Sequence, residues 1–152
     1  MSTLKLLALD ADDLAILSAH VQDAVLTVGD MAYEPKDRRF VALVNRLDLT
    51  APPKGKTLIR RRAALRIERV TRAELQGINL KTKSQVLALL AIDRKVSEEP
   101  AGTITLVCSG GAAVRLHVEC IEASLADLGP AWTTTKKPDH GLKDEPIGAK
   151  KD

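Results

Sequence analysis

The side chains best suited to chemistry in this chain are the arginines of residues 60–72. Residues 53–72 hold eight basic residues and one acidic residue, a net charge of +7, whereas the whole chain carries +3. A guanidinium group pairs with phosphate or carboxylate through two parallel hydrogen bonds. Alternate residues of a strand point to one side, about 7 Å apart. The segment therefore predicts an anion-binding row of Arg60, Arg62, Arg66 and Arg72.

The same arginines have a second interpretation, which the sequence leaves open. Positive charges on a solvated or edge strand discourage edge-to-edge aggregation. They would also pair with the acidic residues that the rest of the chain carries in excess. In that case the arginines serve solubility and stability, and no anion binds.

His117 is the second position with possible chemistry. Arg115 and Glu119 share its face of a predicted strand, so it could act as a general base. A row of polar side chains on a solvated sheet face gives the same pattern. His20 and His140, the other histidines, fall on a predicted helix and near the C-terminus, without the i, i+4 spacing of a metal pair. We predict no catalytic residue, metal site or cofactor, and add Arg115 and His117 to the candidate anion-binding residues.

The two cysteines are predicted to be structural. Cys108 and Cys120 lie on the predicted core face, where cysteine behaves as a small hydrophobe, and they are not opposite each other in the predicted register. Two cysteines do not make a disulfide framework, so a cytoplasmic location is expected. Ser109-Gly110-Gly111 lacks the Gly-Lys-Ser/Thr of a phosphate-binding loop and predicts a turn.

The elements that position these residues are mostly strands. Asp10 is a plausible N-cap for a helix over about 11–22, where Leu14, Leu17 and Val21 recur at helical spacing. The apolar run 86–92 predicts a buried central strand, although its leucines and alanines also suit a helix. The other predicted elements are strands at about 24–33 (with a bulge at Gly29), 40–49 and 59–71, a loop at 51–56, a weakly patterned region at 74–83, a turn at 97–102 and a short helix around 122–128.

The clearest two-residue alternation lies in the hairpin formed by residues 103–120. A two-residue loop would place Leu106 opposite Arg115 and so mix core with surface. A three-residue loop at Gly110–Ala112 places Leu106 opposite Leu116, and glycine supplies the positive φ that such a loop needs. We therefore predict the three-residue loop, with Thr103, Thr105, Arg115, His117 and Glu119 on the outer face.

Together these elements predict one α+β domain over residues 1–135. It has an N-terminal helix followed by six or seven mainly antiparallel strands, which form a curved sheet, a sandwich or a small barrel. Residues 136–152 are charged, have little apolar surface to bury and are expected to be a disordered tail. No apolar run approaches the roughly 20 residues of a membrane span, and the first ten residues do not resemble a signal peptide.

Four blocks of the chain resemble a known family. The blocks are LDADDLAILSAHVQDAV, VGDMAYEPKDRRFVALVNRLD, RRRAALRIERV and GTITLVCSGGAAVRLHVECIEASLADLGPAW, and they occur in the same order. They resemble bacterial family 2948 of the domains of unknown function over about residues 4–135. The resemblance implies a soluble bacterial cytoplasmic protein, and it supplies no catalytic residues.

The function that the sequence favours is a non-enzymatic binding or interaction domain. The alternative is a small enzyme that acts on an anionic phosphate or carboxylate substrate, with the Arg-rich strand as its anion site and His117 as its acid or base. A partner would be an anionic ligand or another protein. Single-stranded nucleic acid is disfavoured because base stacking needs aromatic side chains and the chain has three.

Overall fold

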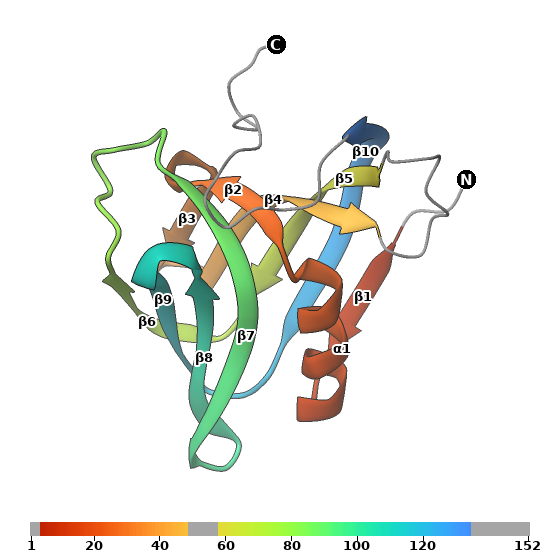
Figure 1. Cartoon of the computed structure of the whole chain (residues 1–152). Helices are drawn as coiled ribbons and strands as arrows, with labels where there is room; N and C mark the ends of the chain where they lie inside the picture. Colours follow the sequence, from red (N-terminus) through yellow and green to blue (C-terminus); the bar gives the residue numbers. More distant parts are fainter. Residues whose placement is uncertain (1–3, 49–57, 135–152) are drawn as a thin grey trace.

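Residues 4–48 and 58–134 of the protein fold into an open, curled sheet of ten strands with one α-helix (Figure 1). The computed structural model describes residues 4–48 and 58–134, and the side chains of residues 130–134 are not described. All strand pairs are antiparallel, in the order β1-β10-β5-β4-β2-β7-β8-β9-β6, and β3 pairs with β4. The elements are β1 (Lys5–Ala8), α1 (Ala11–Val21), β2 (Ala24–Thr27), the 3₁₀ turn η1 (Val28–Asp30), β3 (Met31–Glu34), β4 (Arg39–Asp48), β5 (Leu58–Ile67), β6 (Val70–Gln76), β7 (Val86–Glu98), β8 (Ala101–Cys108), the 3₁₀ turn η2 (Ser109–Gly111), β9 (Ala113–Val118) and β10 (Ala123–Thr134).

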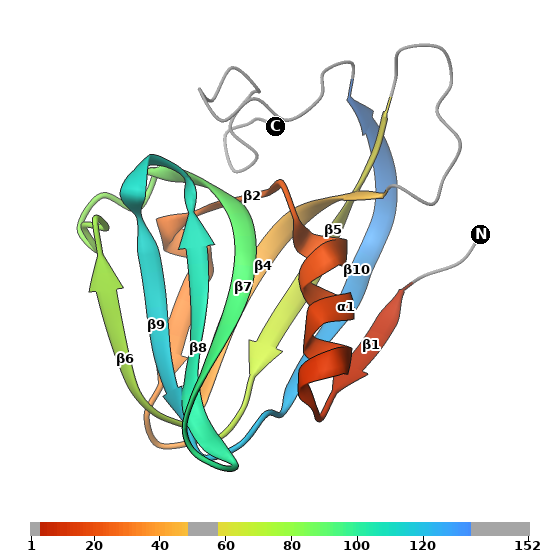
Figure 2. The ribbon, with the colours of Figure 1, turned by 60° about the horizontal axis from the view of Figure 1, so that its bottom comes forward.

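The N-terminal helix begins where the sequence predicts. The Asp10 carboxylate accepts a hydrogen bond from the backbone N–H of Asp13 at 2.8 Å and so caps α1. Leu14, Leu17 and Val21 are buried along one face of the helix. This face packs against β1, β4, β7 and β10 (Figure 2). In the described ranges α1 is the only α-helix, and no described helix is long and apolar enough to cross a membrane.

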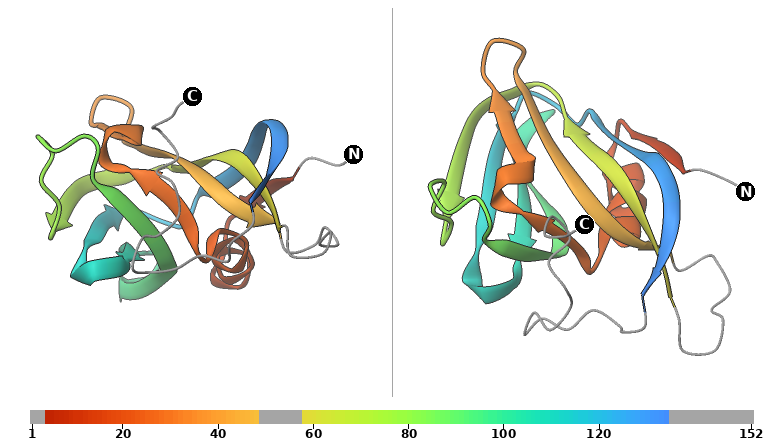
Figure 3. Two further views of the ribbon diagram at one scale, coloured as in Figure 1. Left: turned by 45° about the horizontal axis from the view of Figure 1, so that its top comes forward. Right: turned by 90° about the horizontal axis from the view of Figure 1, so that it is seen from above.

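The core fills the inside of the curled sheet, which Figure 3 shows from two further directions. Its side chains come from alternate positions of the strands, as in Ile104, Leu106 and Cys108 of β8. Val114, Leu116 and Val118 of β9 point to the same side, because opposed residues of paired strands share a face. The two predicted faces of this hairpin are therefore confirmed.

The register of this hairpin differs from the prediction by two residues. Ile104 lies opposite Leu116 and Leu106 opposite Val114, so the three-residue loop is Ser109–Gly111, where the prediction was Gly110–Ala112. Gly110 and Gly111 have φ of 69° and 77°, which side chains other than glycine rarely adopt. The predicted faces are nevertheless correct, because a register shift of two residues leaves every side chain on the same side of the sheet.

The expected number of strands was too low, and two element predictions were wrong. The strand predicted over 59–71 is two strands, since Arg69 adopts φ 61° between β5 and β6 and the chain turns there. β6 also extends into the weakly patterned region. Residues 122–128 belong to β10 and not to a helix, because this segment pairs with β5 on one side and β1 on the other. Tertiary pairing overrides the local helix propensity of its Ala and Leu residues.

The structure also tests several smaller predictions. The run 86–92 is a strand, and it continues as β7 to Glu98. Gly29 lies in η1, so the predicted bulge is a 3₁₀ turn. The turn predicted at 97–102 is shorter, because β8 already begins at Ala101. The loop at 51–56 and the tail at 136–152 lie outside the described residues.

Candidate functional site

The arginines of β5 do not form the predicted exposed row. Arg60 is buried, with 1% of its surface exposed, and its Nη1 donates to the Asn45 backbone oxygen at 2.8 Å. Arg62 is half-buried and lies 3.5 Å from Asp30, with a further hydrogen bond to the Asn45 side chain. Arg66 is exposed on the same strand. The row is therefore split between a buried, a paired and a solvated side chain.

Two further arginines, which we did not select from the sequence, lie on the core face of the sheet. Arg46 Nε and Asp127 Oδ1 are 2.8 Å apart, and Arg61 Nε and Asp48 Oδ2 are 2.6 Å apart, with all four side chains almost fully buried. Arg61 shares the face of Ala63 and Leu65 because it lies at an even spacing from them. Buried pairs of this kind hold the structure together and leave no free cation for a ligand.

The remaining candidates come together on the outer face of β7, β8, β9 and β6. The strand register creates two rows of side chains that cross all four strands. These rows place three of the predicted residues, Arg72, Arg115 and His117, on one surface. The first row is Lys95, Thr103, His117 and Arg72, and the second is Asp93, Thr105, Arg115 and Glu74.

This face is hollowed along its central strand into a depression of about 600 Å³, which we call the β8 trough. The hollow arises because the short side chains of Thr103 and Thr105 on β8 lie between longer side chains on β7 and β9. In the described part of the chain neither threonine hydroxyl makes a hydrogen bond. The trough is lined by Asp93, Arg94, Lys95, Thr103, Thr105, Arg115 and His117.

Glu74 organises the β6 side of the trough. Its carboxylate accepts one hydrogen bond from Arg72 and pairs with His117 Nε2, both at 2.8 Å, while Arg115 Nη1 lies 3.9 Å away. The hydrogen bond with His117, and then the charges of Arg72, His117 and Arg115, lower the pKa of Glu74 against the opposing effect of burial. An ionised Glu74 orients the His117 ring through its Nε2.

The β7 side of the trough contributes cations that the sequence did not single out. Lys95 is exposed and has no ion pair among the described residues. Arg94 pairs with Glu99 at 3.0 Å and also donates to the Pro100 carbonyl, yet its buried Nε has no hydrogen-bond partner. We missed these residues because the predicted strand ended at Ile92. Polar residues 93–95 carry no apolar alternation that would extend it.

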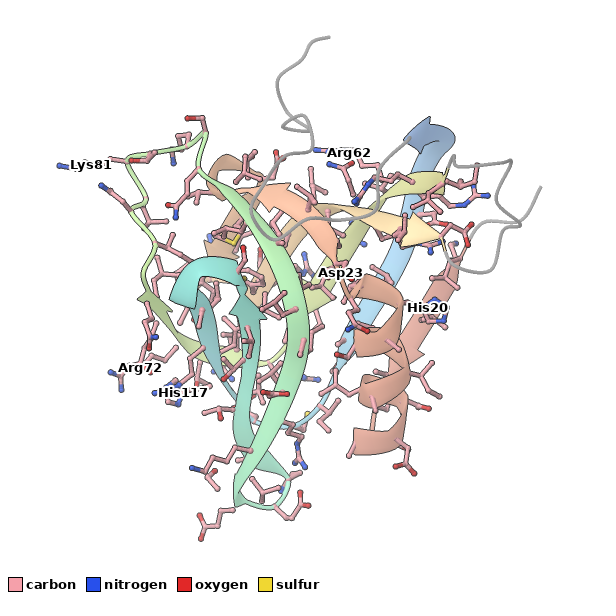
Figure 4. The ribbon with its side chains drawn as sticks, in the orientation of Figure 1. His20, Asp23, Arg62, Arg72, Lys81 and His117 are labelled. Atoms are coloured by element: carbon pink, nitrogen blue, oxygen red, sulfur yellow. The ribbon has the colours of Figure 1, made fainter. Side chains whose placement is uncertain are left out.

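The predicted residues thus divide into two groups that lie apart. Figure 4 shows Arg62 at the upper right of the view, far from Arg72 and His117 at the lower left. β5 and β9 are separated by four strands in the sheet order. Glu119, predicted on the same face as His117, pairs with Arg38 at 3.0 Å. Arg62 and Arg66 of β5 thus lie apart from His117, whereas Arg72 of β6 lies directly opposite it.

The described residues offer little other chemistry. No group of three or more His, Cys, Asp or Glu side chains within residues 4–48 and 58–134 could hold a metal ion. Cys108 and Cys120 are free thiols; Cys108 is buried as predicted, whereas Cys120 is half-buried beyond the end of β9. Burial raises the pKa of the Cys108 thiol to about 11, so this cysteine is protonated at neutral pH and a poor nucleophile.

Comparison with known proteins places the chain in a family. A family model described as "Protein of unknown function (DUF2948)" matches residues 4–140, nearly the whole chain, which confirms the resemblance. The chain belongs to this family. No curated protein and no solved structure matches the chain.

Proposed function

We propose that this protein is a non-enzymatic binding domain that receives an anionic group, carboxylate or phosphate, in the β8 trough. The observation that carries the proposal is that Arg115, on the trough wall, is exposed and has no carboxylate within hydrogen-bond distance. Its side chain is 56% exposed, and the carboxylate nearest to it lies 3.9 Å away. Thr105 lies directly opposite it on β8, and Thr103 and Lys95 lie in the neighbouring row. A ligand carboxylate or phosphate would therefore meet several unused donors at once.

The charge pattern favours one anionic group over an extended polyanion. Asp93 and Glu74 stand at the two ends of the second row, with Thr105 and Arg115 between them. A nucleic-acid backbone needs a continuous series of cations, and these two carboxylates interrupt it. A phosphorylated or acidic small molecule, or one acidic side chain of a protein partner, fits between them.

The proposal also explains why hydroxyls line the floor of the trough. Hydroxyl and guanidinium groups donate hydrogen bonds to anionic oxygens, and bonds to charged groups each contribute about 1.5–3 kcal/mol. Glu74 keeps His117 in place at the edge without occupying Arg115 at hydrogen-bond distance. The site thus offers several donors of a chemistry that suits an anion, and this supports a binding role.

The test is an NMR titration of the ¹⁵N-labelled full chain with inorganic phosphate and with acetate, at low and high salt. We expect saturable shifts confined to β7, β8 and β9 that weaken as salt rises. The Lys95→Gln/Arg115→Gln double variant should bind at least about tenfold more weakly, which is about 1.4 kcal/mol. The matched control is Lys36→Gln/Arg66→Gln, which removes the same charge from two exposed residues elsewhere.

The control variant should bind as the unmodified protein does. Loss of binding in both double variants would mean that net charge, and not the trough, attracts the anion. Absence of shifts with both anions at low salt would refute the proposal.

A further inference from the structure

A second candidate site lies in the wall of the curled sheet, where two strand edges face each other. β3 pairs only with β4, and β6 pairs only with β9, so each has one free edge within the described chain. At one end the edges are joined, because Tyr33 Oη donates to the Val70 carbonyl at 3.1 Å and Val70 N–H donates to the Arg38 carbonyl at 2.9 Å. We call the gap beyond this join the β3–β6 window.

The other end of the window is closed by the segment that follows β6. Gly29 N–H donates to the Lys83 carbonyl at 2.9 Å, which brings residues 77–85 across to the start of β3. A Cβ at Gly29 would lie 3.2 Å from this carbonyl oxygen, so a larger residue here would have to displace the segment slightly. The window is thus bounded by the free edges of β3 and β6, by the join at Val70 and by residues 77–85.

The window opens into a pocket of about 350 Å³ with an apolar lining. Two of the three aromatic residues of the chain, Tyr33 and Phe40, line it. Leu75 and Leu80 also line it and remain 38% and 55% exposed, although both are large and apolar. Exposed apolar side chains that gather at one concave place mark a binding site more often than scattered ones do. The complete lining is Met31, Ala32, Tyr33, Phe40, Ala73, Leu75, Leu80, Lys83 and Val114.

The charge at this pocket has one sign. Lys83 is the single charged side chain in the described lining, and no carboxylate belongs to it. Among the described residues Lys83 makes no ion pair. Lys81 lies two positions away on the same segment and points outward (Figure 4). An apolar pocket with a cation at its edge suits a ligand that carries an apolar body and an anionic head.

We propose that the β3–β6 window binds a small apolar carboxylic acid, with its hydrocarbon part among Phe40, Leu75 and Val114 and its carboxylate at Lys83. The pocket volume falls at the lower end of the range for small-molecule sites, about 300–1,000 Å³. Burial of the hydrocarbon part supplies the main driving force. The head group remains near solvent, so the charge does not pay a large desolvation cost.

This site is separate from the β8 trough. The residues of β6 that line the window, Ala73 and Leu75, alternate with Arg72 and Glu74, which lie in the rows of the outer face. Binding at one site can fail without consequence for the other.

The test compares octanoate with octanol, which has the same chain length and no charge. Methyl NMR of the full chain, labelled at Met and Leu, should show saturable shifts at Met31, Leu75 and Leu80 with both compounds. We expect Lys83→Gln to weaken octanoate binding by about tenfold and to leave octanol binding unchanged. The control Lys5→Gln, which removes an exposed lysine outside both proposed sites, should leave both affinities unchanged.

Two further variants test the location. Ala73→Leu should fill the pocket and abolish binding of both compounds. Leu80→Glu changes an exposed residue, so the fold should be kept, and it should weaken octanoate more than octanol by placing a negative charge beside the head group. Absence of shifts at the three lining residues would overturn the proposal. Equal affinity for octanoate and octanol, unchanged in Lys83→Gln, would also overturn it by removing the role of the carboxylate.

Discussion

Replacement of Asp127 by Asn should destabilise the protein by about 3–5 kcal/mol, the cost of removing one partner of a buried ion pair. Arg46 Nε and Nη2 donate to Asp127 Oδ1 and Oδ2 at 2.8 and 2.9 Å, with side chains 4% and 0% exposed. The same carboxylate accepts a hydrogen bond from the Leu4 backbone N–H at 2.8 Å, next to β1. Asparagine has nearly the same shape as aspartate, but it lacks the negative charge, and its NH₂ group would face a guanidinium donor.

Two companion variants separate this cost from a general effect of charge removal. Glu68→Gln removes a carboxylate from the more exposed Arg39 pair, 3.0 Å apart, and should cost no more than about 1 kcal/mol. The double variant Arg46→Met/Asp127→Leu removes both buried charges together. It should be clearly more stable than Asp127→Asn, because no uncompensated guanidinium remains in the interior.

The pH dependence gives an independent check on the same residue. Burial raises the pKa of Asp127, but the hydrogen bonds from Arg46 and the Leu4 N–H, together with the charges of Arg46 and Arg61, give a net downward shift. A carboxyl with a depressed pKa in the folded state stabilises the fold fully above its unfolded pKa, about 3.9. This contribution is lost as the pH falls from there through the folded pKa. The stability gap between the unmodified protein and Asp127→Asn should therefore narrow below about pH 4.

The measurement is urea denaturation of the unmodified protein and of each variant, at pH 7 and at several values below pH 4. Asp127→Asn within 1 kcal/mol of the unmodified protein at pH 7, or level with Glu68→Gln, would refute the reasoning. A gap between the two proteins that does not narrow in acid would show that the charge of Asp127 is not the stabilising feature.

Three other outcomes follow from the packing of the sheet. Leu116→Ala should cost about 2–5 kcal/mol as a buried large-to-small change, and Val107→Ala on the outer face much less, by urea denaturation. Gly102→Ala should cost about 1–3 kcal/mol, because its Cβ would collide with the carbonyl of the opposed strand β7; a neutral result would contradict this packing. Iodoacetamide should label half-buried Cys120 before buried Cys108 in the native protein, and both equally in urea, as read by mass spectrometry.

Alternation of apolar residues predicted the inside and outside of the best-patterned strands. Ile104, Leu106 and Cys108 are all buried, and Thr103, Thr105 and Val107, which alternate with them, lie on the outer face. The loop position could not be predicted in the same way, since every three-residue loop with the same parity keeps the faces. Only the positions of positive φ, at Gly110 and Gly111 next to Ser109, decide between the two registers.

Strands without strong alternation were harder to predict. Residues 122–128 contain good helix formers, and nothing local indicates that they lie between β1 and β5. Arg72, Arg115 and His117 were predicted separately, and they share a surface only because β6 pairs with β9. Such pairing joins residues more than 40 positions apart. The sequence therefore identified several residues of this surface but did not predict that they lie together.

Charge density along the chain was a poor guide to the candidate site, and the sheet explains why. Arg61 and Arg62 lie in the most basic segment, yet the register brings Asp48 and Asp30 within 4 Å of them. Arg115 stands in a stretch with little net charge, and its nearest carboxylate is already held by His117 and Arg72. A cation is available to a ligand only where the fold leaves it short of carboxylates. That shortage depends on cross-strand neighbours, which the order of residues in the chain does not reveal.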